Sequence, residues 1–180
     1  MNSIDTENIA SFEKVSLAEY LRTCMGGRLE PYDTEGARNL REALTSEWEN
    51  IRLPERATFG SAGYDFYLPH DLCLSQYPMT VYTGIRCVIK PGWVLLLFPR
   101  SGLGFKYGVQ LVNGTGVIDS DYSNADNEGH IAAKLYAGSY PVSLNAGDRF
   151  MQGIFVPYGT ADNGNTDGER HGGFGSTGMG

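Results

Sequence analysis

Cysteine is scarce in this chain of 180 residues, and the cysteines that are present form no recognisable set. Cys24, Cys73 and Cys87 are odd in number and far apart, with no CxxC pair and no His/Cys spacing typical of zinc. This pattern excludes a disulfide framework and predicts reduced thiols, as in a cytoplasmic protein. The chain does not begin with a basic segment followed by an apolar one, so we expect no secretory signal.

Positive charge and long apolar runs are also lacking. The chain has 14 lysines and arginines against 21 aspartates and glutamates, a net charge of −7. A surface this acidic disfavours nucleic acid as a partner, because nucleic-acid binding needs clustered basic residues. The longest apolar run, WVLLLF at 93–98, is far too short to cross a bilayer, so we expect no membrane partner. A polyphosphate ligand stays possible if arginines, backbone amides or a divalent cation offset the repulsion.

Glycine and tyrosine, in contrast, are abundant, with 24 and 11 residues. This composition favours a turn-rich β protein over a helical bundle. Between residues 53 and 158, short apolar runs alternate with breaks of Gly, Pro, Asn and Asp, which is typical of a sandwich or barrel. The expected strands are YDFYL, TVYTGIRCVI, GWVLLLF, GVQLVN, GVI, HIAAKLY and FMQGIFVPY. We predict a mainly β fold, with one domain over residues 1–158.

The N-terminal part departs from this β pattern. SFEKVS (11–16) predicts a short strand, and a helix is expected over 17–25, with Ser16 and Glu19 spaced as a capping box. A second helix is expected over 35–50 with Thr34 as its N-cap, so residues 26–50 form a helical insertion. One face of this helix carries an apolar stripe, Leu40, Leu44, Trp48 and Ile51. We expect the stripe to pack on its own domain; the alternative is a docking surface for another protein.

The C-terminal residues 159–180 contain almost nothing to bury, which predicts a flexible segment. Near its end, however, RHGGFGSTG sets an arginine, a phenyl ring and two hydroxyls close together. The histidines, His70, His130 and His171, show no metal spacing, and we interpret all three as surface residues.

Two short stretches carry residues suited to chemistry. PRSGLG (99–104) follows a predicted strand and offers the Arg100 fork, the Ser101 hydroxyl and the Gly102 backbone to an anion. The alternative is a solvated turn. In GVIDSDY (116–122), a strand would hold Asp119 firmly, which suits a group that orients an attacking water; the alternative is a β-turn. Arg149 and Gln152 look like ordinary strand-edge residues.

Five motifs in order resemble those of the trimeric deoxyuridine triphosphatases, or dUTP diphosphatases. They are SAGYD (61–65), PRSGLG (99–104), NGTGVIDSDY (113–122), GDRFMQG (147–153) and RHGGFGSTG (170–178). The resemblance covers residues 53–178 together with SFEKVS. It implies a β-sandwich of jelly-roll type and a homotrimer with three active sites at subunit interfaces. It also implies hydrolysis of dUTP to dUMP and pyrophosphate with Mg²⁺.

The resemblance also implies roles for individual residues. Asp119 would orient the water that attacks the α-phosphorus, and Tyr122 would pack under the deoxyribose. Asp65 would support the metal's water shell or the geometry of the site. The uracil edge would be read by Asn113 and by the backbone of Gly116, Val117 and Ile118. The phosphates would be held by Arg100, Ser101, Gly102 and Gln152. Residues 159–180 would fold over the nucleotide as a lid, with Phe174 on the uracil, Gly175 in the tight backbone, and Arg170, Ser176 and Thr177 at the γ-phosphate.

The chain also departs from the family pattern. SNADNE (123–128) lengthens the hairpin after Tyr122, and only His171 separates Arg170 from the following glycines, one residue fewer than usual. A dCTP deaminase of the same fold is the nearest alternative, but Lys134 stands where its catalytic glutamate would be, and a lysine cannot replace a carboxylate proton shuttle. A regulatory protein partner could dock on residues 26–50 or on SNADNE, in addition to catalysis.

Overall fold

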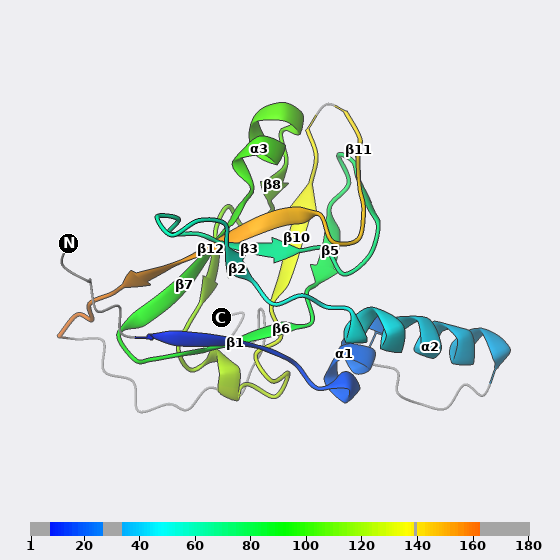
Figure 1. The fold of residues 1–180 in the computed structure, drawn as a ribbon, viewed down its shortest axis with the longest axis horizontal. Coiled ribbons are helices and arrows are strands. Elements are labelled where there is room, and N and C mark those ends of the chain that lie inside the picture. Colours follow the sequence, from blue (N-terminus) through cyan, green and yellow to red (C-terminus); the bar gives the residue numbers. More distant parts are fainter. Residues whose placement is uncertain (1–7, 27–33, 139, 163–180) are drawn as a thin grey trace.

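The structure, a computed structural model, describes residues 8–26, 34–138 and 140–162 (Figure 1). Strands dominate these residues, and every strand pair is antiparallel, which agrees with the predicted mainly β fold. The largest sheet has five strands in the order β2-β3-β12-β7-β9, with the nine-residue β12 at its centre. Its members are β2 (Glu55–Arg56), β3 (Tyr64–Tyr67), β12 (Arg149–Pro157), β7 (Trp93–Pro99) and β9 (Gly116–Ile118).

Three smaller sheets complete the fold. The three-stranded sheet has the order β5-β10-β8, and two further pairs are β1-β6 and β11-β4. These strands are β1 (Ala10–Lys14), β4 (Leu72–Leu74), β5 (Met79–Tyr82), β6 (Ile85–Ile89), β8 (Gln110–Leu111), β10 (Ala132–Tyr136) and β11 (Val142–Leu144). Alternate side chains of the strands point inward and form one hydrophobic cluster, which includes Phe66, Leu95, Ile118, Leu135 and Phe150. A jelly-roll sandwich requires such a core, because the inward faces of its sheets pack against each other.

Two helices lie together at one end of the molecule (Figure 1). They are α1 (Leu17–Cys24) and α2 (Glu35–Glu49), and both agree with the predicted helices. Thr34 caps α2 as expected. Trp48 holds the C-terminal end of α2 in place by donating from Nε1 to the Val15 carbonyl at 2.9 Å. Leu44 and Trp48 pack against the core, but Leu40 stays 47% exposed, so the apolar stripe covers its own domain only in part.

A glycine lies where the helices meet the sheets. Gly84 has a φ of 69°, and a Cβ there would lie 2.1 Å from Ile51 Cδ1 and 3.2 Å from the ring of Tyr20. Both Tyr20 and Ile51 are buried. The close approach of the helical segment to the strand pair therefore depends on the missing side chain.

Two interpretations of the sequence need correction. PRSGLG is not a solvated turn, because residues Ser101–Tyr107 form helix α3. His130 is not a surface residue: it is 2% exposed, and its Nε2 accepts the backbone N–H of Gly84 at 2.9 Å. Burial lowers the pKa of His130 to about 4, so this side chain is neutral. His70 is partly exposed, while His171 lies outside the described residues.

The capping box is also only half formed. Ser16 Oγ accepts the Glu19 backbone N–H at 3.1 Å, as the motif predicts. The Glu19 carboxylate, however, bonds Arg22 and Thr23 instead of reaching back to Ser16. The Ser16 backbone N–H donates to Glu128 instead.

The thiols agree with the prediction of reduced cysteines. Cys24, Cys73 and Cys87 form no disulfide. Burial raises the pKa of Cys24 to about 11 and that of Cys87 to about 12, which makes both thiols unreactive near neutral pH. In the part of the chain that is described, no helix combines the length and apolarity needed to span a membrane.

Candidate functional site

A buried carboxylate on β3 holds two arginines from distant parts of the chain. The Asp65 side chain is only 5% exposed, and its two oxygens have different partners. Arg100 donates from Nη1 to Oδ1, and Arg149 donates from Nη1 to Oδ2 at 3.2 Å. A guanidinium has five N–H donors, and these contacts use one donor of each. The arginine side chains remain 29% and 47% exposed, so two oriented positive charges face solvent, as an anion site requires.

A β-bulge places Arg149 on this face of the sheet. Gln152 lies opposite Asp65, but Arg149 lies opposite Tyr67, so Phe150 is an extra residue in β12. Without the bulge, alternation would direct Arg149 away from the face that carries Asp65 and Gln152. The bulge therefore adds the second arginine to the cluster.

Residues of three predicted motifs thus meet at one end of strands β3, β12 and β7 in the large sheet. Gln152 lies against the first motif, since a Cβ on Gly63 would be 2.9 Å from Gln152 Oε1. Arg100 directly follows β7 in an extended conformation, and the exposed residues Ser101 and Gly102 come next, in the first turn of α3. We call Asp65, Arg100, Arg149 and Gln152, together with the Ser101–Gly102 turn, the arginine cluster.

A cavity of about 300 Å³ shares strands β7 and β12 with the arginine cluster through Leu97 and Met151, but no residue of the cluster lines it. Its size is at the lower end of the range found for small-molecule sites. Asn113 and Gly116 line it, as expected for a base-reading hairpin, whereas Val117 and Ile118 do not. Gly116 packs closely, because a Cβ there would lie 3.0 Å from Leu97 Cβ. The remaining lining residues were not predicted: Thr80, Tyr82, Leu97, Leu111, Val112, Ala132, Ala133, Lys134 and Met151.

The hairpin that follows β9 carries the predicted catalytic carboxylate. Asp119 is exposed and directly follows the buried Ile118. Tyr122, expected near a sugar, is 3% exposed and does not line the cavity. Its hydroxyl donates to the His130 carbonyl at 3.0 Å, and Asn127 Nδ2 donates to that hydroxyl at 2.9 Å. The structure of the single chain therefore buries Tyr122 inside the hairpin.

Within one chain, Asp119 and the arginine cluster lie at opposite ends of the β7-β9 pair. Ile118 lies opposite Leu95, five residues before Arg100. At roughly 3.3 Å per residue, five residues span about 16 Å along the strand. An aspartate that far away cannot direct a water at a phosphate bound by Arg100 of the same chain.

The other expected ligand groups are only partly visible. In the described ranges, no three His, Cys, Asp or Glu side chains gather closely enough to hold a metal ion. Both oxygens of Asp65 accept hydrogen bonds from arginines. The predicted lid residues, Arg170, Phe174, Gly175, Ser176 and Thr177, lie outside the described residues.

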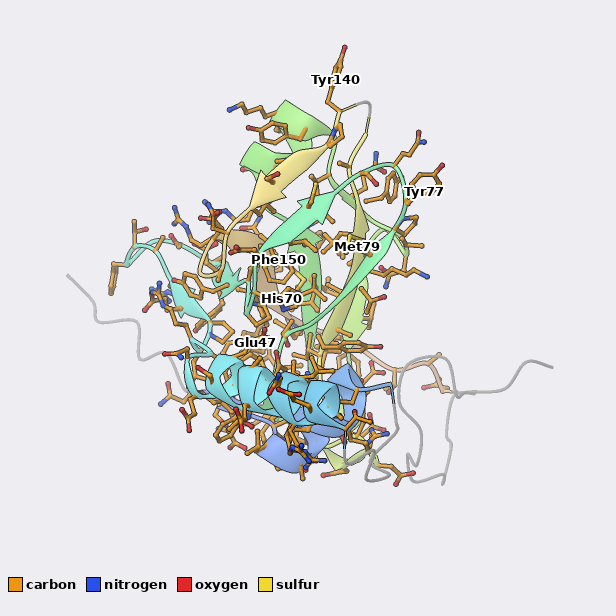
Figure 2. All side chains as sticks on the ribbon, turned by 90° about the vertical axis from the view of Figure 1, so that its right-hand side faces the viewer. Glu47, His70, Tyr77, Met79, Tyr140 and Phe150 are labelled. Atoms are coloured by element: carbon orange, nitrogen blue, oxygen red, sulfur yellow. The ribbon has the colours of Figure 1, made fainter. Side chains whose placement is uncertain are left out.

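A second carboxylate cluster joins the two N-terminal helices to the sheets (Figure 2). Glu47 on α2 accepts a hydrogen bond from the Tyr20 hydroxyl of α1 and contacts His70 Nδ1 at 3.1 Å. The bond to Glu47 raises the pKa of His70. Burial opposes ionisation of Glu47, but the bonds from His70 and Tyr20 outweigh it and lower its pKa. We call Tyr20, Glu47 and His70 the helix-docking cluster.

Comparison with known proteins places these features in a family. Residues 49–178 match the dUTPase family model, so the match begins at the end of α2. The deoxyuridine 5'-triphosphate nucleotidohydrolase of Lactococcus lactis is 38% identical over 133 residues, which is 71% of this chain and 89% of that protein.

Solved structures are similar as well. The dUTPase of Streptococcus mutans, at 41% identity, aligns with a TM-score of 0.56 over 63% of this chain and 91% of its own. A mutant dUTPase of Staphylococcus bacteriophage 80alpha, 18% identical, aligns with a TM-score of 0.54 over 90% of this chain and 98% of its own, and shares the fold. The description of that structure says that phage dUTPases control transfer of virulence genes.

Proposed function

Because the chain belongs to the dUTPase family, we propose that it hydrolyses dUTP to dUMP and pyrophosphate. The observation that carries this proposal is the buried Asp65, which orients Arg100 and Arg149. The chain also has a cavity of base size, lined by Asn113 and Gly116. Triphosphate oxygens match guanidinium donors, and the cavity adds a place for the pyrimidine.

The arginine cluster binds the phosphates. Four kinds of group are available to the phosphates at one end of β7 and β12. They are the Arg100 guanidinium, the Ser101 hydroxyl, the Gly102 backbone and the Gln152 amide. Arg149 looks like an ordinary strand-edge residue in the sequence. It joins these groups because the bulge turns it toward Asp65. Asp65 acts through the geometry of the site: its carboxylate fixes the two arginines.

The cavity receives the uracil. Asn113 offers an amide oxygen and an amide nitrogen, which suit the uracil edge, and the backbone of Gly116, Val117 and Ile118 completes the contacts. Cytosine reverses the donor and acceptor pattern of uracil, so it leaves polar groups unpaired and is rejected strongly. Tyr122 supports the deoxyribose. Tyr122 is buried in the isolated chain. It therefore either supports the sugar from within the hairpin or turns outward when the nucleotide binds.

Asp119 orients the attacking water, and the active site is shared between chains. The separation of about 16 Å along β7-β9 leaves Asp119 too far from the arginines of its own chain. A homotrimer with sites at its subunit interfaces brings Asp119 of one subunit to the arginine cluster of a neighbour. The C-terminal segment, with Arg170, Phe174, Gly175, Ser176 and Thr177, then covers the nucleotide and excludes bulk water.

Mg²⁺ is the proposed cofactor, and the donors present fit it. Mg²⁺ binds oxygen and usually combines one or two carboxylates with substrate phosphates. Because no acidic trio occurs among the described residues, the ion would be bound mainly by the triphosphate, with Asp119 near its water shell. When bound, it neutralises part of the phosphate charge.

The deaminase alternative is disfavoured at the cavity itself. Lys134, which stands at the position of the deaminase glutamate, lines this cavity. An ammonium group cannot accept the proton that such a reaction must move.

Binding of a regulatory protein is a second candidate role, in addition to hydrolysis. Leu40 is an exposed apolar residue on α2, which lies outside the family match. We expect Leu40→Glu to leave turnover unchanged and to abolish any complex formed through α2. A complex that survives this substitution would assign the partner to another surface.

The test of the proposed function is pyrophosphate release from dUTP, dCTP, dTTP and UTP in parallel, each with Mg²⁺ and with EDTA. We expect turnover of dUTP alone, and only with Mg²⁺. Size-exclusion chromatography with light scattering reports the oligomer in the same preparation. Equal turnover of dCTP, or full activity as a monomer, would contradict the proposal.

A further inference from the structure

The loop of residues 123–130 closes tightly over Tyr122. The Tyr122 hydroxyl lies between the His130 carbonyl and the Asn127 amide. At Gly129, a Cβ would lie 2.7 Å from both Ser123 Cα and the Tyr122 carbonyl oxygen. The loop is therefore a compact unit, and its shape is coupled to the position of the Tyr122 backbone.

Glu128 bonds this loop to the start of α1. Its Oε2 accepts the Ser16 backbone N–H at 2.7 Å, and its Oε1 accepts the Ser16 hydroxyl at 2.6 Å. The two residues are 112 positions apart in sequence. The carboxylate takes the place that the capping box assigns to Glu19, which bonds Arg22 instead. A negative charge here also favours the N-terminal end of the helix.

The backbone of Glu128 indicates that this contact is specifically held. Among the described residues that are not glycine, Glu128 alone has a positive φ, at 56°. Glutamate gains nothing from this conformation, which glycine or asparagine adopts more easily. The two short hydrogen bonds offset this cost, since bonds to a charged acceptor are the stronger kind.

A short path leads from Glu128 to the proposed catalytic aspartate. Gly129 packs on Tyr122, and the Tyr122 backbone N–H donates to the Asp119 carbonyl at 3.1 Å. A second contact holds the loop from β6, where Arg86 donates to the Ser123 carbonyl at 2.9 Å. The turn that carries Asp119 is thus held from behind by α1 and β6.

We infer that Glu128 is a positioning residue, which fixes the direction of the Asp119 carboxylate by bonding its hairpin to α1. The inference rests on the proposed role of Asp119. It unites α1 and the hairpin lengthened by SNADNE in one structural unit. It also means that a change in the position of α1 alters the geometry of hydrolysis.

Three substitutions at Glu128 separate the effect of its carboxylate from the effect of its backbone conformation. Glu128→Ala removes the carboxylate and keeps an unfavourable φ, whereas Glu128→Gly removes it and relieves the φ. Glu128→Gln keeps the shape and one acceptor oxygen. Asp126→Ala is the matched control, because Asp126 is an exposed carboxylate of the same loop.

We expect kcat for dUTP to fall between about 10-fold and 100-fold in both Glu128→Ala and Glu128→Gly, the range typical of a small misplacement of a reacting group. KM and binding of the α,β-imido analogue of dUTP should change little. Glu128→Gln should recover most of kcat, and Asp126→Ala should match the parent.

A second measurement does not depend on activity. Amide hydrogen exchange over residues 116–124 should be faster in Glu128→Ala than in Asp126→Ala. Full kcat in Glu128→Gly would overturn the inference, and so would unchanged exchange in Glu128→Ala. If the parent protein fails to hydrolyse dUTP, the proposed function fails instead, while the exchange experiment still tests the contact between the loop and α1.

Discussion

Two carboxylates, Asp65 and Glu47, each join distant parts of this chain, but their partners differ in kind. Asp65 holds Arg100 and Arg149, whose side chains stay 29% and 47% exposed. Glu47 holds the fully buried Tyr20 and the ring of His70. Each guanidinium keeps donors beyond the one that Asp65 engages, whereas the single hydroxyl proton of Tyr20 is used by Glu47.

This difference separates a site from a structural joint. The arginine cluster combines a buried anchor with outward donors, so it can bind a second anion without losing its internal bonds. In the helix-docking cluster, the Tyr20 hydroxyl and His70 Nδ1 both contact Glu47 Oε1, and these contacts hold α1 and α2 on the β domain. A buried carboxylate therefore indicates a ligand-binding site mainly when its partners keep hydrogen-bond donors that are not used within the protein.

The largest effect should come from a residue outside both clusters. Asp119→Asn should lower kcat for dUTP by about 1000-fold, because general-base assistance to the water is lost. Binding of the α,β-imido analogue should persist, since the arginine cluster is intact. Pyrophosphate release and calorimetry measure the two quantities, with Asp126→Asn as the control. Parental turnover in Asp119→Asn would contradict the assignment of Asp119 as the residue that orients the attacking water.

Asp65→Asn should break the arginine cluster itself. It leaves two cations without their buried partner, and we expect a loss of about 3 kcal/mol in the free energy of unfolding, the low end for a buried pair because Arg149 is half exposed. KM for dUTP should rise as well. Glu47→Gln is the contrasting variant, because it should destabilise the fold without changing KM. A raised KM in Glu47→Gln would remove the distinction between the clusters.

The neutral His130 should make the region between hairpin and helices sensitive to acid. Burial lowers its pKa from 6.5 to about 4, so below pH 6.5 the unfolded chain takes up a proton that the folded chain does not. Stability is therefore lost as pH falls from about 6.5 to about 4, by about 3 kcal/mol. His130→Gln should remove this part of the loss. Chemical denaturation at several pH values measures it, and identical pH profiles would contradict the prediction.

The smallest expected effect belongs to the helix-docking cluster. The bond to Glu47 raises the pKa of His70, so its contribution to stability is full below pH 6.5 and is lost as pH rises through the folded value. His70 is 40% exposed, which limits this contribution to about 0.5 kcal/mol. His70→Gln should be less stable than the parent at pH 6 and equal to it at pH 8.5. The opposite order would show that the pair does not hold the helices.

Local patterns in the sequence predicted most strands and the two N-terminal helices. The family resemblance, in contrast, named Asn113 and Gly116, which line the cavity. Arg100 directly follows β7, Gly116 begins β9, and Asn113 lies in the turn between β8 and β9. Arg149 looks like an ordinary strand-edge residue in the sequence. Strict alternation would put it on the other face from Gln152, and only the bulge at Phe150 reverses this. A bulge depends on pairing with a strand about 80 residues away, which no local pattern records.

His130 and Glu128 escaped prediction for a related reason. Alternation in HIAAKLY puts His130 on the same face as the exposed Lys134, but β10 begins only at Ala132, so the chain turns before alternation applies. Glu128 lies in a polar stretch typical of a solvated tip. Its partner is 112 residues away, and only the folded chain reveals the contact.

Gly84 lies where the N-terminal helical segment packs most closely on the strands. Since the space for one methyl group there is occupied by Ile51 Cδ1 and the ring of Tyr20, adding that carbon would force these side chains to shift without altering any residue of either helix. One hydrogen atom at this position thus helps to set how closely α1 and α2 pack on the β-sandwich.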